Sequence, residues 1–254
     1  MAIDLKAIQR GRQARPPRIV IYSEHGMGKS TFASQAPSPI FIPTEDGLGA
    51  LDVAAFPLAT TYQAVMDAIG VLYTDDHDYK TVVLDSLDWL EALVWGHVAR
   101  EGGEETIEGF GYGKGYVYAC DRFRDVLAGL NALRTDKGMA VILTAHSMVK
   151  RFDDPASEPY DRYMLKLHSK AAGIVQEWAD VVGFIAQQMV VRKEDVGFNK
   201  KVARGVAIGG HVLHLKRTPA FDGKNRYSLP DAIPLGWGAF ADAMTEAHAP
   251  STDK

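Results

Sequence analysis

The sequence predicts an α/β fold, a doubly wound and mostly parallel sheet followed by a C-terminal β-meander and a terminal helix. Three observations carry this prediction. Short, continuous, β-branched apolar runs recur along the first part of the chain, which is typical of strands covered on both faces. Segments with apolar residues at helical spacing separate these runs, and this alternation indicates parallel strands joined by covering helices. From about Asp180 the pattern changes to successive strand-like runs, which indicates a meander.

Taken in order, the predicted parallel strands are RIVIY (18–22), PIFIP (39–43), TVVLD (81–85) and AVILTA (140–145). The predicted helices are GKSTFASQA, TYQAVMDAIGVLY, LDWLEALVWGHVAR and YVYACDRFRDVLAGLNAL. The meander comprises DVVGFIAQQMVV, KKVARGVAIGG and HVLHLKR, and the last helix lies near 237–247. A chain of 254 residues suits one large domain as well as two small ones. We expect a single domain over residues 18–248, between a basic leader (1–17) and a frayed tail (249–254).

Composition restricts the classes of protein and the partners to consider. The net charge of -4 supplies no overall positive field, so any nucleic-acid binding must come from local basic clusters. Cys120 is the single cysteine, which excludes an internal disulfide and a cysteine-only metal cage, and we interpret it as a small buried hydrophobe. Apolar stretches stay well short of the roughly 20 residues of a membrane span, and the amino terminus has no hydrophobic signal core. We therefore expect a soluble, cytoplasmic protein without a membrane partner.

The stretch VIYSEHGMGKST closely follows the phosphate-loop pattern GxxxxGK[ST], with Ser23 at the position of the first glycine. Such a loop needs inward N–H groups, a helix amino terminus, a lysine for the β and γ phosphates and a hydroxyl for Mg²⁺. A serine can replace the first glycine if its φ stays negative. The alternative is a glycine-rich turn with a chance lysine. The predicted residues for ATP binding are Ser23, Gly26, Met27, Gly28, Lys29, Ser30 and Thr31.

Carboxylates at the ends of predicted strands complete a hydrolytic site. Asp85 ends a buried strand, where an ionised carboxylate is costly unless it binds a cation, so we expect it to hold Mg²⁺ opposite Ser30. A capping role for the following helix suits Asp88 better. Glu45 follows another strand and is expected at the carboxyl edge of the sheet, where it can polarise a water for in-line attack on the γ phosphate. Asp46 is the competing candidate, and a plain surface acid is the alternative.

His146 follows the strand at 140–145 and opens a polar stretch of some twenty residues, which we interpret as a long loop. Long loops in compact domains are usually functional or disordered. The imidazole can hydrogen-bond the γ phosphate or its attacking water and so signal its presence to the segment that follows. The alternative is a structural histidine at a strand end whose hydrogen bonds are made within the protein. Cations concentrate in and beside this stretch, namely Lys150, Arg151, Arg162, Lys166, His168 and Lys170. They suit a groove that follows a nucleic-acid backbone, although the interspersed acids also suit a solvated surface.

Two further segments can each be interpreted in two ways. In EGFGYGKGYVY, glycines alternate with Phe110, Tyr112 and Lys114, so the segment can stack bases and meet phosphate, or can form a hydrophobic lid. In FDGKNRYSLP, Lys224 and Arg226 lie two residues apart, and in an extended segment they project from one face. They can act as arginine-type fingers toward a nucleotide on an adjacent subunit, or protect an exposed strand edge.

These features in this order resemble the RecA/RadA recombinase ATPase core and, in compact form, phage-type ATP-binding proteins related to single-strand annealing recombinases. The resemblance implies a RecA-like fold over about Arg18 to Leu235, and the host cytoplasm if the chain is phage-encoded. FIPTEDGLGALD resembles the segment with the catalytic glutamate, and VVLDSL resembles the Walker B strand. GYGKGYVYACDRFRDVLAGL falls where the first DNA-binding loop lies, and the stretch after ILTAH where the second lies. By resemblance, His146 is the polar sensor and GKNR carries fingers that act across subunits.

The expected function is an ATPase that uses ATP and Mg²⁺ and assembles on single-stranded DNA as a homo-oligomeric ring or filament, in support of DNA recombination, annealing or repair. Nucleotide lies at the subunit interfaces in this prediction. The alternative is a nucleotide-switched protein-interaction module without DNA binding. A small-molecule kinase is less favoured because an arginine-rich lid is not evident. The predicted catalytic residues are Glu45, Lys29, His146, Lys224 and Arg226.

Overall fold

A mixed sheet of ten strands runs through the part of the chain that the computed structural model describes, residues 15–155, 158–195 and 201–249. The strands are β1 (Arg18–Ser23), β2 (Pro39–Pro43), β3 (Ala54–Ala55), β4 (Thr81–Asp85), β5 (Ala140–Phe152), β6 (Tyr160–Leu165), β7 (Val181–Asp195), β8 (Lys201–His214), β9 (Lys224–Asn225) and β10 (Ala232–Pro234). The helices are α1 (Lys29–Ser34), α2 (Tyr62–Thr74), α3 (Leu87–Glu101), the 3-10 helix η2 (Ile107–Phe110), α4 (Lys114–Asp136), α5 (Ser169–Trp178) and α6 (Trp237–His248). Most of the predicted leader and tail, residues 1–14 and 250–254, lies outside the described residues.

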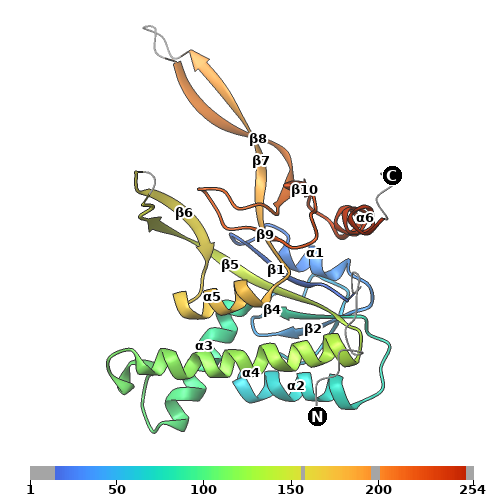
Figure 1. The fold of residues 1–254 in the computed structure, drawn as a ribbon, viewed down its shortest axis with the longest axis vertical. Helices are drawn as coiled ribbons and strands as arrows, with labels where there is room; N and C mark the ends of the chain where they lie inside the picture. The colour runs from blue at the N-terminus through green and yellow to red at the C-terminus, as the bar shows by residue number, and fades with distance from the viewer. Residues whose placement is uncertain (1–14, 156–157, 196–200, 250–254) are drawn as a thin grey trace, which may run out of the picture.

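The centre of the sheet is parallel, as predicted. The strand order is β10-β8-β7-β1-β5-β4-β2-β3, with parallel pairing from β7 through to β3. Strand β5 lies between β1 and β4, so the carboxyl ends of β1 and β4 lie beside the middle of β5, where Ser23 is in register with His146 and Leu84 with Leu143. The mixed α/β architecture, with helices on both faces, confirms the predicted fold class (Figure 1).

Two hydrophobic cores cover the two faces of the sheet. Because side chains alternate along a strand, Val20 and Tyr22 pack in one core while Ile19 and Ile21 pack in the other. Helices α2, α3, α4 and α5 cover the first face, and α1 and α6 cover the second (Figure 1). Each large apolar side chain buried in these cores contributes about 1.5–3 kcal/mol. Cys120 is buried in α4, as predicted.

Helix α2 shows how local sequence sets an element boundary. Thr61 occupies its N-cap, and the Thr61 hydroxyl accepts a hydrogen bond from the Ala64 N–H at 3.1 Å. Such a cap stabilises a helix by roughly 1 kcal/mol. Val65, Ile69 and Leu72 then recur at helical spacing and are buried.

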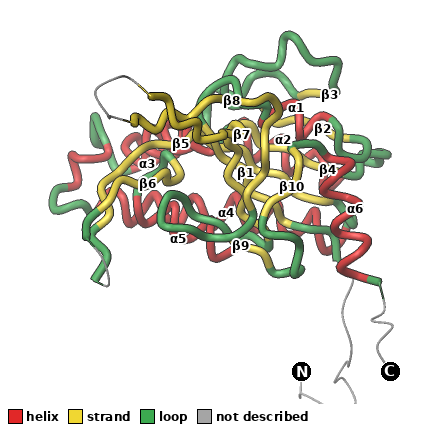
Figure 2. The backbone as a smooth tube through the Cα atoms, turned by 90° about the horizontal axis from the view of Figure 1, so that it is seen from above, coloured by secondary structure: helices red, strands yellow, loops and turns green. Residues whose placement is uncertain are grey.

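Two projecting hairpins differ from the predicted elements. The polar stretch after His146 is not a long loop, because β5 continues to Phe152 and pairs antiparallel with β6. The predicted meander begins as one long antiparallel hairpin of β7 and β8, in which the last two predicted runs form a single strand. Figure 1 shows both hairpins extending from the body, and Figure 2 places the β5–β6 arm and α6 on opposite sides. Among the helices that the structure describes, none is long and apolar enough to cross a membrane.

Candidate functional site

The loop between β1 and α1 has the backbone that a phosphate cradle needs. Gly26 has φ 71° and Gly28 has φ 91°, a left-handed region that glycine enters without the steric cost of a Cβ atom. A Cβ at Gly28 would also lie 3.2 Å from Leu235 Cδ2. Ser23 completes β1, is fully buried and has no positive φ, so the condition under which serine replaces the first glycine is met.

Lys29 begins α1 and is only 6% exposed. Its Nζ donates to Ser23 Oγ at 3.4 Å and to the carbonyl oxygen of Glu24 at 3.1 Å. Burial lowers the pKa of this ammonium group, and the negative charge of Asp85 opposes that change. A buried ammonium that donates to neutral oxygens in the loop is suited to an anionic phosphate.

Ser30 and Asp85, the predicted Mg²⁺ ligands, are in direct contact. Ser30 Oγ donates to Asp85 Oδ2 at 2.6 Å, and Thr144 Oγ1 donates to Asp85 Oδ1 from the neighbouring strand β5. Asp85 is 3% exposed, so these hydroxyls replace the water that its carboxylate loses. Among the described residues, no group of three or more His, Cys, Asp and Glu is arranged to hold a metal. A hydroxyl and one carboxylate nevertheless fit Mg²⁺, which takes its other ligands from substrate phosphates and water.

His146 is held beside this pair by Asp88. His146 Nδ1 lies 2.9 Å from Asp88 Oδ2, and the His146 backbone N–H donates to Asp88 Oδ1 at 3.0 Å. Ser86 Oγ donates to the same carboxylate oxygen at 3.0 Å. Burial by itself would raise the pKa of Asp88, but the hydrogen bonds from His146 and Ser86 outweigh it and hold that pKa at about 2.

This contact corrects the helix-capping role predicted for Asp88. Ser86 occupies the N-cap of α3, and Asp88 in the first turn directs its carboxylate to His146. The pattern of the sequence could not reveal this, because the partner is 58 residues away in the chain.

Glu45 faces the same edge of the sheet. Glu45 Oε2 lies 3.9 Å from His146 Nδ1, whereas Asp46 is exposed to solvent. Burial raises the pKa of Glu45, the nearby His146 opposes this and Asp85 adds to it. The structure therefore brings Glu45 rather than Asp46 to the residues of the predicted hydrolytic site.

Thr44, His25 and Thr144 belong to the site but were missed by sequence reasoning. Thr44 Oγ1 accepts from the Ser86 N–H at 2.8 Å and donates to the Ser86 carbonyl at 2.7 Å, which fixes the segment carrying Glu45 against the end of β4. The His25 ring lies over the His146 ring, with 4.0 Å between centroids. The closeness of His146, and then burial, lower the pKa of His25.

The predicted DNA contacts of the glycine-rich segment have different environments. Phe110 is partly buried against the larger core, with its ring 5.3 Å from Tyr118. Tyr112 is fully exposed at φ 48°, and Lys114 is exposed at the start of α4. Of these three side chains, Tyr112 and Lys114 are therefore available at the surface.

The cations of the β5–β6 arm also divide into two groups. Lys150 and Arg151 are exposed on β5. Arg162 is 2% exposed, ion-pairs with Asp222 at 2.6 Å and donates to the carbonyl of Thr218 at 3.1 Å. The expectation that Arg162 contacts DNA is therefore wrong, because its guanidinium is buried in an internal network.

Lys224 and Arg226 lie at the other edge of the sheet, where the parallel strands begin. Lys224 Nζ donates to the carbonyls of Gln176 and Glu177 at the end of α5, at 2.7 and 2.9 Å. Arg226 is half exposed and pairs with Asp180, the residue before β7, at 3.2 Å. The pair is thus remote from the phosphate loop of its own chain, and its action across a subunit interface stays a prediction.

Comparison with known proteins identifies a family whose model covers the site. A family model described as "AAA domain" matches residues 15–227, a span that contains the phosphate loop, β4, β5 and all the site residues above. No curated protein matches the chain.

Proposed function

The chain belongs to the AAA domain family of P-loop ATPases, and from this premise we propose that it is a RecA-like ATPase that assembles on single-stranded DNA and supports DNA recombination, annealing or repair. The observation that supports ATP hydrolysis is the convergence of Lys29, Asp85 and Glu45 at one edge of the sheet. The observation that favours DNA is that β5 carries His146 at this edge and then continues into an arm with exposed cations.

Binding of the triphosphate follows from the loop and the two carboxyl-edge residues. The backbone N–H groups of the loop and the Lys29 ammonium would hold the β and γ phosphates. Ser30 and Asp85 would hold Mg²⁺, which neutralises charge on the transferring phosphoryl group when it is bound.

The hydrolytic step is assigned to Glu45, assisted by His146. A base works best when its pKa approaches the working pH, and burial moves the pKa of Glu45 in that direction. His146 directs Nδ1 at Asp88, so Nε2 is the ring atom that can meet the γ phosphate or the attacking water. Asp88 therefore serves as a positioning residue for the sensor.

Assembly and DNA binding rest on residues away from the phosphate loop. Lys150 and Arg151 on the arm, with Tyr112 and Lys114 in the glycine-rich segment, supply exposed cations and an aromatic face for a single strand. We assign Lys224 and Arg226 to the nucleotide of a neighbouring subunit. Their distance from their own phosphate loop supports a role across an interface.

The test is ATP hydrolysis by the purified protein with and without single-stranded DNA, at low salt with Mg²⁺. We expect DNA to raise the turnover number, and Lys29→Ala to have no turnover in either condition. Hydrolysis that DNA leaves unchanged would contradict the DNA part of the proposal and favour a nucleotide-switched module for a protein partner. Imaging with a nonhydrolysable ATP analogue, with and without the strand, then distinguishes ring, filament and monomer.

A further inference from the structure

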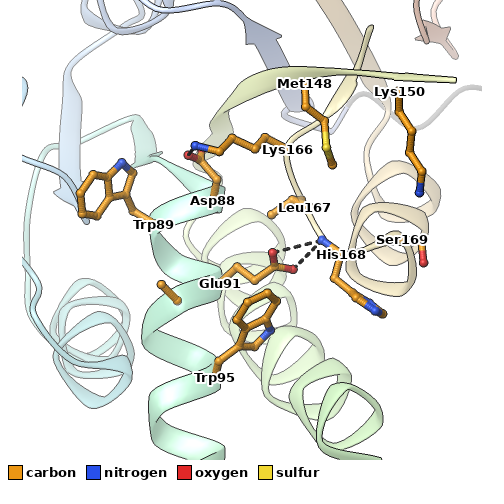
Figure 3. Close-up of a pocket in the computed structure, with 11 residues that line it drawn as sticks. Asp88, Trp89, Glu91, Trp95, Met148, Lys150, Lys166, Leu167, His168 and Ser169 are labelled. Carbon is orange, nitrogen blue, oxygen red and sulfur yellow. Dashed lines mark hydrogen bonds and ion pairs between the residues drawn. The ribbon is translucent and has the colours of Figure 1, made fainter. Parts of the chain in front are cut away.

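An open hollow of about 580 Å³ lies beside Asp88, between α3, the β5–β6 arm and the start of α5. Figure 3 shows Trp89 on one side of it, Lys150 on the other, Lys166 and Met148 above, and Trp95 below. Its volume is within the range of roughly 300–1,000 Å³ that small-molecule pockets occupy. None of the catalytic roles assigned above uses this hollow, although one wall is the residue that positions the sensor.

The hollow has a tryptophan on two of its sides, Trp89 and Trp95, both from α3 (Figure 3). Trp89 is 52% exposed, although burial of an indole is strongly favourable. Trp95 packs edge-on against Tyr116, with centroids 5.3 Å apart, and Tyr116 stacks on the His168 ring at 4.4 Å and an interplanar angle of 2°. These contacts fix the lower wall before any ligand arrives, which reduces the entropy lost on binding.

The rim of the hollow carries two exposed cations. Lys150 and Lys166 are exposed on its rim. Of the two acids in the wall, Asp88 is engaged by His146, and Glu91 accepts the His168 N–H with both oxygens, at 2.9 and 3.1 Å. Burial raises the pKa of Glu91 to about 7, so its negative charge is partly suppressed at neutral pH.

We propose that the hollow binds a short segment of single-stranded nucleic acid, in which bases stack on the indoles of Trp89 and Trp95 and phosphates are held by Lys150 and Lys166. A base and its phosphate combine a flat apolar face with a negative charge, which is the combination that these four side chains complement. The inference rests on the proposed function, since it specifies where on this ATPase the strand is held.

Lys166 also connects the hollow to the hydrolytic site. Its Nζ lies 3.9 Å from Asp88 Oδ2, Asp88 holds His146, and His146 Nδ1 lies 3.9 Å from Glu45 Oε2. A phosphate in the hollow would compete with Asp88 for Lys166, and the Asp88 carboxylate would then interact more strongly with His146. Lys166 is thus a positioning residue through which an occupied hollow changes the sensor.

The first test measures the affinity of the full chain for a fluorescent oligothymidylate by anisotropy, with Mg²⁺ and a nonhydrolysable ATP analogue. Stacking of one base on an aromatic side chain predicts that Trp89→Ala and Trp95→Leu each weaken binding by about 5- to 100-fold. Tyr73→Ala is the matched control, because Tyr73 is 43% exposed on α2 and does not line the hollow. Thermal unfolding confirms that each variant is folded, and Trp89→Ala removes a side chain that is already half exposed.

The outcomes separate this inference from the proposed function. If the unaltered protein does not bind the oligonucleotide, the DNA part of the proposed function fails and the hollow fails with it. If the unaltered protein binds the oligonucleotide and both tryptophan variants bind it with the affinity of the unaltered protein, only the assignment of the hollow is overturned. If thymidine monophosphate displaces the oligonucleotide and binds with equal affinity, the ligand of the hollow is a free nucleotide. That result would overturn the proposal that the hollow binds a nucleic-acid strand.

The second test concerns Lys166 and uses a ratio of turnover numbers. At saturating oligonucleotide, Lys166→Gln should bring the turnover with DNA, divided by that without, toward one. Lys170→Gln is the control, because Lys170 is also exposed and lies outside the hollow. A ratio that Lys166→Gln leaves at the unaltered value would overturn the role of Lys166.

Discussion

The contact between Asp88 and His146 makes a quantitative prediction for Asp88→Asn. Hydrogen bonds from His146 and Ser86 hold the pKa of Asp88 at about 2, compared with its ordinary value of 3.8. At 1.36 kcal/mol per pH unit, this difference corresponds to about 2 kcal/mol of folding stability. Asp88 lines an open hollow, from which solvent screens the interaction, so we expect Asp88→Asn to lower the free energy of unfolding by about 1–2 kcal/mol at pH 7.

The contribution of Asp88 to folding stability should depend on pH in a defined direction. Because the pKa of Asp88 is lower in the folded state, its contribution is fully present above pH 3.8 and is lost as the pH falls through about 2. Urea unfolding from pH 7 to pH 3 should therefore show a difference between the two proteins that begins to narrow below about pH 4. Asp121→Asn is the control, since Asp121 pairs with Arg124 at an exposed site, and it should change stability by less than about 0.5 kcal/mol. Equal stability of Asp88→Asn and the unaltered protein at pH 7, or a difference that stays constant down to pH 3, would refute the reasoning.

Three further predictions concern the chemistry. Lys29→Ala should abolish the heat of ATP binding in calorimetry, because it removes the buried ammonium; heat equal to that of the unaltered protein would contradict the phosphate-loop assignment. Glu45→Gln should bind ATP normally but lower kcat by about 10²- to 10⁴-fold. Because burial raises the pKa of Glu45, lowering the pH should protonate this base, and kcat of the unaltered protein should begin to fall while the pH is still above the ordinary carboxylate range. Normal turnover in this variant would transfer the role to Asp46. Mixing Arg226→Ala with Lys29→Ala protein should restore part of the activity if the fingers act across subunits, and complete failure despite assembly would argue against it.

The sequence predicted those parts of the site that depend on one element at a time. The limits of β2 and β4 agree with the predicted runs, because strands buried on both faces are continuous apolar runs. Asp85, Glu45 and His146 could be assigned to one edge because parallel strands end there together. Their place in the chain was sufficient for that assignment, without knowledge of which strands are neighbours.

The parts that escaped prediction depend on the strand order. Thr144 contacts Asp85 only because β5 lies between β1 and β4, and periodicity does not give that order. Arg162 illustrates the same limit, since its burial follows from Asp222, a partner 60 positions further along the chain. The β5–β6 arm was interpreted as a loop because its polar residues obscured the alternation of a two-stranded ribbon.

Strand β5 connects the hydrolytic site to the hollow. Side chains two apart on a strand share a side, and this spacing holds along the row from Thr144, at the Asp85 carboxylate, through His146 to Met148 and Lys150 at the hollow. In the proposed function, any shift of this strand that improves the fit of a nucleic-acid strand also moves the sensor. Coupling between two binding sites is reciprocal, so the same shift must let ATP alter the affinity for DNA. A sensor on β4 would lack this property, because β4 ends at Asp85 and sends no residue into the arm.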